Sequence, residues 1–267
     1  MKIIVLIKQV PDMEKVKFDR EKGRIDRSSA GTEINPFDLN ALEAALQIGE
    51  KIGAGVTAIT MGPPQAEEAL REAIARGADE GILLTDAKFG GSDVKATSSI
   101  LAAAIKKIGS YKLVIAGIQT VDGDTGQVGP EVAEHLNIPH ISNIDEIISC
   151  SMEHIEVKCN LWDSYFIKRG KYPLLLTVTK DVNTPRLPSF KNKMNARKAE
   201  IIKWSWEDLK SVIDDSCIGM KGSPTKVKKI EVPSAVMREG KLYSDIDDGV
   251  AHLLNVLKDS KVLREAQ

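Results

Sequence analysis

The sequence predicts an α/β fold: a parallel twisted sheet with helices on both faces, antiparallel strand additions and a C-terminal arm. Two observations support this. Over the first 140 residues, short apolar runs alternate with amphipathic segments at the spacing of right-handed β–α–β units. A chain of 267 residues, 42% of them hydrophobic, is also long enough to bury the core of a large domain.

The first strand is expected at 2–10, where KIIVLIKQV is mostly apolar and Pro11 ends the run. The first helix follows within 34–54. Asp38 is its expected N-cap, because a short polar side chain can accept a hydrogen bond from the first turn. The apolar face of this helix recurs at helical spacing and comprises Leu39, Leu42, Ala45, Leu46 and Gly49.

The next units repeat this pattern of a short apolar run followed by an amphipathic segment. Small residues are frequent in the later helix, and a glycine ends the earlier one. The expected elements are strands at 56–63, 81–86 and 112–118 and helices at 65–79 and 94–109.

After about residue 145 the strand-like runs have no helices between them. The stretches 153–162 and 164–180 therefore predict antiparallel strands added to the sheet. Residues 181–204 show little periodicity, and an irregular segment of that length is either functional or disordered. Helical patterns at 208–215 and 249–262 suggest an arm that packs on another surface.

Composition and charge exclude several classes of function. A net charge of −1 gives no reason to expect nucleic acid or an anionic membrane as a partner, and aromatic residues are too scarce for an RNA-stacking surface. The apolar stretch before Lys8 is too short for a signal peptide, and no run reaches the roughly 20 apolar residues of a membrane span. Because Cys150, Cys159 and Cys217 form no CxxC pair, we expect no metal or iron–sulfur ligation and a reduced, cytoplasmic setting.

The most informative stretch is VDGDTGQVGPE (121–131), which follows the strand expected at 112–118. In an open parallel sheet, ligands bind beyond the carboxyl ends of the strands. Three glycines let the backbone approach an anion closely, and the helix expected next adds its dipole. Thr125 and Gln127 can donate side-chain hydrogen bonds. The pattern favours a nucleotide-binding loop, and the alternative is an Asp/Gly loop without a ligand.

Asp122 and Asp124 fit a phosphate poorly, because carboxylates repel it. One of them can cap the amides of its own loop or bind a ribose hydroxyl, and either role removes the conflict. No common nucleotide fingerprint is present. GxxxxGK[ST] is missing, and KQVPDME stands where GxGxxG would follow the first strand.

The other strand ends complete the predicted pocket, in which Lys8 approaches the cofactor or its phosphates or is simply solvated. No GxSxG or HExxH motif accompanies the pocket, so no catalytic acid or base is assigned. His135, His140, His154 and His252 are expected in surface or packing positions. The predicted cofactor-binding residues are Leu6, Lys8, Asn35, Pro36, Phe37, Asp38, Met61, Ala116, Gly117, Ile118, Gln119, Thr120, Val121, Asp122, Gly123, Asp124, Thr125, Gly126, Gln127 and Val128.

Taken together, these stretches resemble the small (beta) subunit of electron-transfer flavoproteins. The resemblance runs almost from end to end and is carried, in order, by KQVPD, INPFDLNALEAAL, the MGP turn, REAIARGADEGILL, AGIQTVDGDTGQVGP and PRLPSFKNKMNARK. It implies an adenine-nucleotide-binding, Rossmann-like sheet and a larger alpha subunit as partner. It also divides the chain into a nucleotide- and flavin-binding domain at 1–183, a partner-recognition loop at 184–200 and an arm at 201–267 that packs on the alpha subunit.

The loop at 121–131 resembles one of two variants of that family. Electron-bifurcating members hold a complete FAD in the beta subunit, whereas plain electron shuttles bury AMP there. Gly123 and Thr125 are the residues that imply room for the FAD diphosphate. By this resemblance the flavin takes a hydride from NADH and splits the electron pair between ferredoxin or flavodoxin and, through the alpha-subunit FAD, a partner flavin dehydrogenase. The chain is then a subunit of an NAD- and ferredoxin-linked oxidoreductase complex whose redox chemistry belongs to the cofactor.

In the family, the counterpart of 184–198 docks the dehydrogenase through an apolar side chain. Leu187 and Phe190 are the implied anchors, flanked by Arg186 and Lys191, as in a hot spot with a charged rim. Phe190 stands where the family usually has leucine, so the dehydrogenase is of the acyl-CoA or of the 2-hydroxyacid (lactate) type. A flexible basic linker is the alternative interpretation.

Two further functions are left open by the sequence. One is a non-bifurcating electron shuttle subunit with structural AMP. The other, more distant, is a stand-alone adenine-nucleotide-binding regulatory protein, which is expected to be shorter and to lack the basic loop and the arm.

Overall fold

The structure is a computed structural model that describes residues 2–12, 17–19, 24–26, 31–161, 163–226, 228 and 240–260. The chain divides into two compact units, Met1–Lys228 and Lys229–Gln267, and each is described by itself. The strands are β1 (Lys2–Leu6), β2 (Gln9–Pro11), β3 (Lys17–Asp19), β4 (Arg24–Asp26), β5 (Thr32–Ile34), β6 (Gly55–Met61), β7 (Glu80–Leu84), β8 (Leu113–Gly117), β9 (His140–Cys150), β10 (His154–Leu161), β11 (Ser164–Lys171), β12 (Leu174–Val178) and β13 (Ile202–Trp204). The helices are α1 (Pro36–Ile52), η1 (Pro64–Ala66), α2 (Glu67–Arg76), η2 (Ala87–Phe89), α3 (Val94–Ile108), α4 (Val128–Leu136), α5 (Phe190–Lys198), α6 (Trp206–Leu209), η3 (Asp215–Cys217), α7 (Gly219–Gly222) and α8 (Ile246–Asp259).

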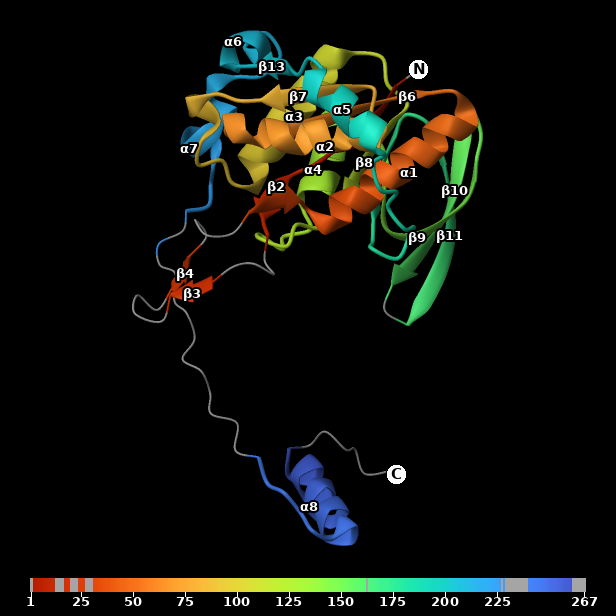
Figure 1. Cartoon of the computed structure of the whole chain (residues 1–267), viewed down its shortest axis with the longest axis vertical. Coiled ribbons are helices and arrows are strands. Elements are labelled where there is room, and N and C mark those ends of the chain that lie inside the picture. The colour runs from red at the N-terminus through yellow and green to blue at the C-terminus, as the bar shows by residue number, and fades with distance from the viewer. Residues whose placement is uncertain are drawn as a thin grey trace. The chain divides into compact units, whose positions relative to one another are not determined.

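A mixed sheet forms the centre of the first unit (Figure 1). Its described strands lie in the order β11-β10-β9-β12-β8-β1-β6-β7-β13. All neighbours from β9 to β13 pair in parallel, whereas β10 and β11 continue the sheet beyond β9 in antiparallel pairs. The predicted fold class, a parallel α/β sheet with antiparallel additions, is therefore confirmed.

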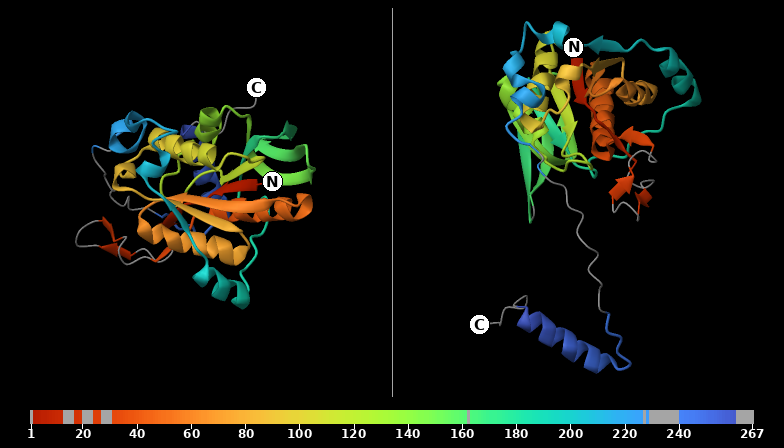
Figure 2. Two further views of the ribbon diagram at one scale, coloured as in Figure 1. Left: turned by 90° about the horizontal axis from the view of Figure 1, so that it is seen from above. Right: turned by 90° about the vertical axis from the view of Figure 1, so that its left-hand side faces the viewer.

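Helices cover both faces of this sheet (Figure 2). Helices α1 and α2 lie on one face, and α3 and α4 lie on the other. The chain runs outward from β1 through β6 to β7, and then returns by α3 to β8 on the other side of β1. Strand–helix–strand crossovers are right-handed. When the chain reverses the direction in which it adds strands to the sheet, the connecting helices therefore lie on the opposite face.

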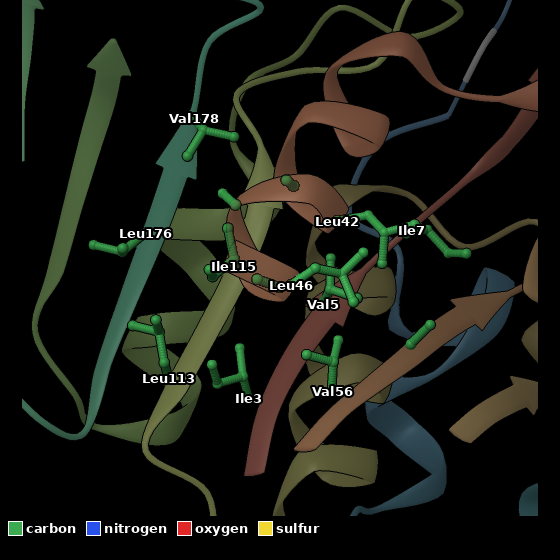
Figure 3. Packing of buried hydrophobic residues seen from close by; sticks show 14 of the residues in the cluster. Ile3, Val5, Ile7, Leu42, Leu46, Val56, Leu113, Ile115, Leu176 and Val178 are labelled. Atoms are coloured by element: carbon green, nitrogen blue, oxygen red, sulfur yellow. The ribbon is translucent and has the colours of Figure 1, made fainter. Parts of the chain in front are cut away.

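Alternation along the central strands supplies one hydrophobic cluster to each face. On β1, Ile3 and Val5 join the cluster under α1, whereas Ile4 joins the cluster under α3. In Figure 3, Leu42 and Leu46 of α1 lie over these strands. Strands that are buried on both faces must be apolar almost throughout, which is why their sequences are recognisable as continuous apolar runs.

Two predictions at the start of the chain are wrong. Residues 2–10 do not form one strand, because β1 ends at Leu6 and β2 pairs with β5 outside the main sheet. Asp38 is not the N-cap of α1: the cap position is Asn35, and Pro36 occupies the first turn, where its missing N–H costs nothing. The Asp38 carboxyl instead accepts hydrogen bonds from distant backbone, as described below.

Three predictions in the second half of the chain also need correction. Residues 174–178 are not antiparallel: β12 pairs in parallel with both β8 and β9. Residues 181–204 are not irregular throughout, because they contain α5 and β13. Ser189 starts α5 by accepting a hydrogen bond from Asn192 N–H at 3.1 Å. The helix expected at 208–215 is reduced to the short α6 and a turn before η3.

The described part of the second unit is dominated by α8, which agrees with the helical pattern at 249–262 up to Asp259. Asp245 caps it by accepting hydrogen bonds from the N–H groups of Asp247 and Asp248. Of the arm predicted at 201–267, residues 227, 229–239 and 261–267 lie outside the described residues. None of the described helices combines the length and the apolar character needed to cross a bilayer.

Candidate functional site

A cavity of about 380 Å³ lies at the carboxyl ends of β1, β6 and β8. After β1 the chain enters α1 on one face of the sheet, and after β8 it enters α4 on the other. The strand order therefore reverses between β1 and β8, and such a switch point leaves a crevice in which α/β proteins bind ligands. The lining comprises Leu6, Ile7, Lys8, Asp38, Met61, Ser92, Asp93, Val94, Thr97, Leu101, Ala116, Gly117, Ile118, Gln119, Thr120, Gly123, Thr125, Gly126, Gln127, Val128 and Gly129.

Most of the predicted cofactor-binding residues thus lie on one cavity, although six do not line it. These are Asn35, Pro36, Phe37, Val121, Asp122 and Asp124. Asn35 acts behind the wall instead. Its side-chain amide donates to Gln119 C=O at 2.8 Å and its side-chain oxygen accepts from Val121 N–H at 3.1 Å, so it holds the loop after β8 in place.

The loop itself is a tight backbone structure. Asp124 N–H donates to Thr120 C=O at 2.8 Å, which closes a turn across residues 120–124. Asp124 and Gly126 both have a left-handed backbone, with φ of 52° and 64°. Such turns direct successive N–H groups toward one side and can form an anion-binding concavity. Glycine suits position 126 because a side chain is strained at that φ.

Asp38 fastens the ends of two strands to the start of α1. Its carboxylate accepts from Lys8 N–H at 2.8 Å and from Gly117 N–H at 3.1 Å. Burial raises the pKa of Asp38 to about 7, against hydrogen bonds from Asn35, Lys8 and Gly117 that lower it. The approach is close enough that a Cβ at Gly117 would lie 2.5 Å from Asp38 Oδ1 and 2.7 Å from Phe37 Cβ. Glycine is therefore required at 117 by packing.

The Lys8 ammonium forms an ion pair with Asp122, with 2.6 Å between Nζ and Oδ2. Burial alone would raise the pKa of Asp122, but hydrogen bonds from Lys8 and Thr120 outweigh it and hold that pKa below its ordinary value. The negative charge of Asp122 is thus compensated within the protein. This contact, which differs from both roles predicted for the loop aspartates, removes most of the expected repulsion between Asp122 and a phosphate.

The N-termini of α3 and α4 both open on the cavity, and the first of them was not predicted. Ser92, Asp93, Val94 and Thr97 come from the start of α3, and Gln127 and Val128 come from the start of α4. Helix N-termini carry unpaired N–H groups and a partial positive charge, so two of them together favour an anion. The signal in the sequence was GGSD before the third helix, which marks a cap and a tight turn at the end of a neighbouring strand.

Asp93 joins α3 to the chain segment after α7. It caps α3 by accepting from Ala96 N–H at 3.1 Å, and its other oxygen accepts from Thr225 N–H at 2.9 Å and from the Thr225 hydroxyl at 2.7 Å. Burial alone would raise the pKa of Asp93, but the hydrogen bonds from Thr225 and Ala96 hold it below its ordinary value. Asp93 is therefore a fully engaged structural carboxylate at the cavity wall.

The titratable side chains that line the cavity are Lys8, Asp38 and Asp93, and each of them has a hydrogen-bond partner within the chain. Of the four histidines, none lines the cavity: His135 contacts Ser99, His154 contacts Ser151 and Arg169, and His252 stacks near Tyr243. No group of His, Cys, Asp and Glu side chains suited to a metal ion occurs among the residues that the structure describes. The backbone donors and hydroxyls of the cavity can bind a ligand.

A second predicted site lies on residues 184–198, here called the docking segment. Leu187 and Phe190 are 86% and 82% exposed, and Lys191 is also exposed. Arg186, by contrast, is turned back on α1, where it pairs with Glu43 and Glu50 at 2.8 and 2.5 Å. The predicted anchors are therefore free to meet a partner, while Arg186 is engaged within the chain.

The chain is similar to known proteins along almost its whole length. The family model described as "Electron transfer flavoprotein domain" matches residues 22–209. The electron transfer flavoprotein subunit beta of Clostridium acetobutylicum is 42% identical over 259 residues, which cover 97% of this chain and 98% of that protein. The caffeyl-CoA reductase-Etf complex subunit CarD of Acetobacterium woodii is 40% identical, with 98% and 100% covered. The acryloyl-CoA reductase electron transfer subunit gamma of Anaerotignum propionicum is 39% identical, with 95% and 98% covered.

Proposed function

Since this chain belongs to the electron transfer flavoprotein family and matches its beta subunits, we propose that it holds a complete FAD in a bifurcating complex. The complex takes electrons from NADH and divides them between ferredoxin or flavodoxin and a partner flavin dehydrogenase. The observation that carries the proposal is the cavity at the β1–β8 switch point, where a glycine-containing loop meets the N-termini of two helices.

The donors around the cavity suit a nucleotide diphosphate. Residues at the starts of α3 and α4 line it together with Thr97 and Thr125, whose hydroxyls can donate. The ammonium of Lys8 also lies at the wall, where its pairing with Asp122 leaves the two side chains without net charge. A volume of about 380 Å³ would hold the adenosine and phosphate part of such a cofactor.

Gly123 favours FAD over AMP. A Cβ at this position would meet only Thr120 Oγ1, at an ordinary 3.5 Å, and its φ lies outside the left-handed region. The fold itself therefore does not demand glycine at 123, in contrast to Gly117. A ligand that lies against the backbone there explains the glycine, and a diphosphate reaches further along the loop than a single phosphate does.

In this proposal the chain binds and orients the flavin, and the flavin itself supplies the redox chemistry that converts a hydride into single electrons. Asp38 and Asn35 hold the strand ends and the loop that form the cavity wall. The Lys8–Asp122 pair keeps the loop from repelling a phosphate. Preorganised donors of this kind bind an anion without first having to rearrange.

The relatives favour a dehydrogenase of the acyl-CoA type over the lactate type. Two of these relatives are named for reductases of CoA thioesters, caffeyl-CoA and acryloyl-CoA. We propose that the docking segment presents Leu187 and Phe190 to such a partner, and that an alpha subunit completes the complex.

Flavin counting and an anaerobic assay test this function. The purified complex with the alpha subunit is expected to contain two FAD, whereas one FAD with one AMP would identify a plain electron shuttle. With NADH and oxidised ferredoxin, reduction of ferredoxin is expected only when the acceptor of the dehydrogenase is also present. Ferredoxin reduction that is independent of the acceptor, or absent, would contradict bifurcation.

The loop is tested by filling the proposed diphosphate position. Gly123→Arg and Thr125→Arg are each expected to remove the FAD of this subunit and leave the other FAD in place. Ser110→Arg is the matched control, since it adds the same side chain at an exposed position outside the cavity lining. Full flavin content in both loop variants would show that the diphosphate does not lie there.

A further inference from the structure

We propose that Arg186 is a positioning residue of the docking segment and does not contact the partner. Its side chain fastens the segment to α1 and so fixes where Leu187 and Phe190 meet the dehydrogenase. The inference rests on the proposed function of the docking segment. It reverses the expectation from the sequence, in which Arg186 belonged to the charged rim of the contact.

Arg186 uses its hydrogen-bond donors inside the chain. Nε donates to Glu43 Oε2 at 2.8 Å and Nη2 to Glu43 Oε1 at 3.1 Å, which is the two-pronged geometry of a strong guanidinium–carboxylate pair. Nη1 and Nη2 reach Glu50 at 2.5 and 3.2 Å. Its backbone is held as well, because its N–H donates to Glu43 Oε2 at 3.0 Å and its C=O accepts from Arg76 at 2.6 Å.

Glu43 is the buried half of this attachment. Its side chain is 5% exposed, so it cannot form part of a contact surface. Burial alone would raise the pKa of Glu43, but hydrogen bonds from Arg186 and Gln47 hold it below its ordinary value, and the carboxylate stays charged at neutral pH. A buried carboxylate of this kind needs its cation, and so the chain at 186 cannot leave α1 without a large cost.

Neighbouring contacts secure the chain on both sides of the anchors. Before Arg186, the side-chain amide of Asn40 donates to Asn183 C=O at 2.8 Å, and that of Asn183 donates to Asn40 C=O at 3.0 Å. After the anchors, Arg71 donates to the carbonyls of Ala196, Arg197 and Ala199 at 2.8, 3.0 and 3.1 Å. Arg71 thereby satisfies the open carbonyls at the end of α5 and opposes its dipole.

Between these two attachments the segment is exposed and apolar on one side. Phe190 and Met194 are one helical turn apart on α5, and both are exposed, as is Leu187. The only charges from 184 to 198 are positive: Arg186, Lys191, Lys193, Arg197 and Lys198. The surface therefore fits a partner with an apolar pocket and a carboxylate rim. Holding both ends in place reduces the entropy that docking must remove.

The test measures electron transfer from the dithionite-reduced complex to the caffeyl-CoA reductase of Acetobacterium woodii. It compares the parent with variants of Arg186, Glu43 and Lys191. Arg186→Ala and Glu43→Gln are each expected to raise the KM for the reductase about tenfold with kcat unchanged. The double variant is expected to be no worse than either single one, and Arg186→Lys to be intermediate, because one ammonium cannot hold two carboxylates. For these variants the salt dependence of KM is expected to stay as in the parent. The control is Lys191→Ala, which removes an exposed cation and is expected to make the salt dependence of KM shallower.

A second measurement needs no partner. In the complex with the alpha subunit, amide hydrogen exchange at 185–194 is expected to rise about tenfold in Arg186→Ala and in Glu43→Gln and to stay unchanged in Lys191→Ala. The inference is overturned if exchange is unchanged in Glu43→Gln, or if Arg186→Ala alone raises KM and flattens the salt dependence. Failure of the proposed docking function looks different: the KM is then unchanged when Leu187 and Phe190 are both replaced by Ala.

Discussion

At the scale of single residues, Asp38 and Gly117 show how tightly the cavity wall is built. One carboxylate joins backbone groups that lie 30 residues before it and 79 residues after it. Two N–H groups donate to this buried carboxyl, and the close approach is possible only because residue 117 has no side chain. Substitutions at these two positions therefore measure how much the packing of the cavity wall contributes to stability.

Gly117→Ala is expected to destabilise the first unit by about 1–3 kcal/mol, because the new Cβ overlaps Asp38 Oδ1 and Phe37 Cβ. Gly123→Ala is the matched control, with an expected change of less than about 0.5 kcal/mol in the cofactor-free chain. Urea unfolding followed by tryptophan fluorescence measures both. Equal stabilities would mean that α1 can move away from β8 at little cost.

Asp38 also predicts how stability depends on pH. Because its folded pKa is raised from 3.8 to about 7, the folded state keeps a proton that the unfolded chain has already released. The free energy of unfolding due to this group is therefore highest below pH 4, falls as pH rises toward 7, and is level above that. In Asp38→Asn this fall, which amounts to about 4 kcal/mol between the two limits, is expected to disappear.

The measurement is urea unfolding of both proteins at pH 4.5 and 7.5. Taking the difference between the two proteins cancels groups such as Asp122 and Glu43, whose pKa values shift in the opposite direction. An identical pH dependence in the two proteins would show that Asp38 is ionised at ordinary pH in the folded state.

At the scale of elements, α3 depends on a capping residue that also holds a distant segment. Asp93 caps the helix with one oxygen and binds Thr225 with the other. Asp93→Ala is expected to lower the stability of the first unit by about 1–2 kcal/mol and to raise hydrogen exchange at 217–226. Asp245→Ala removes the equivalent cap of α8 in the second unit and should leave the first unit unchanged. A protected 217–226 segment in Asp93→Ala would mean that other contacts hold it.

Elements differ in how far the sequence could predict them. The buried strands and the helices α2 and α3 were predictable, since their periodicity follows from burial on one or both faces. The parallel pairing of β12 was not, because the direction of an apolar run is set by the neighbours it meets. Helix α5 was missed because its short basic sequence has little apolar periodicity, and its ends depend on Ser189 and on Arg71 from another helix.

The residues of the cavity also differ in how far the sequence could predict them. Most of residues 116–128 line the cavity, and they were predictable because glycine and small polar residues follow an apolar strand. Ser92, Asp93 and Thr97 were missed, because only the strand order brings the start of α3 to the ends of β1 and β8. The pairing of Lys8 with Asp122, 114 residues apart, could not be found from local pattern.

At the scale of the whole molecule, several large apolar side chains are exposed together on each of two described elements beyond the docking segment. Tyr165, Phe166 and Ile167 are exposed on β11, the edge strand of the sheet. Ile246, Val250, Leu253 and Leu254 form a stripe along α8 at helical spacing. Exposed patches and open sheet edges favour association, so both elements are consistent with a chain that works in a complex.

Leu253→Asp is expected to weaken assembly with the proposed alpha subunit by about 2 kcal/mol or more, because it places a charge in the apolar stripe of α8. Asn255→Asp is the control, since it adds the same charge on the opposite side of the helix. Titration calorimetry with the alpha subunit measures the affinity, and the melting temperature of the first unit should stay constant. Equal affinities of the two variants would exclude the stripe from the interface.

The insertion of β12 between β8 and β9 has a consequence for the order in which the chain can fold as it is made. Strands β7, β6, β1 and β8 can assemble once residue 117 has emerged from the ribosome, since each of them pairs with at least one of the others. The meander β9–β11 has no place in the sheet until residues 174–178 follow it. A nascent chain that ends between these points therefore carries unfinished sheet edges, among them that of β8, and open edges of this kind favour aggregation.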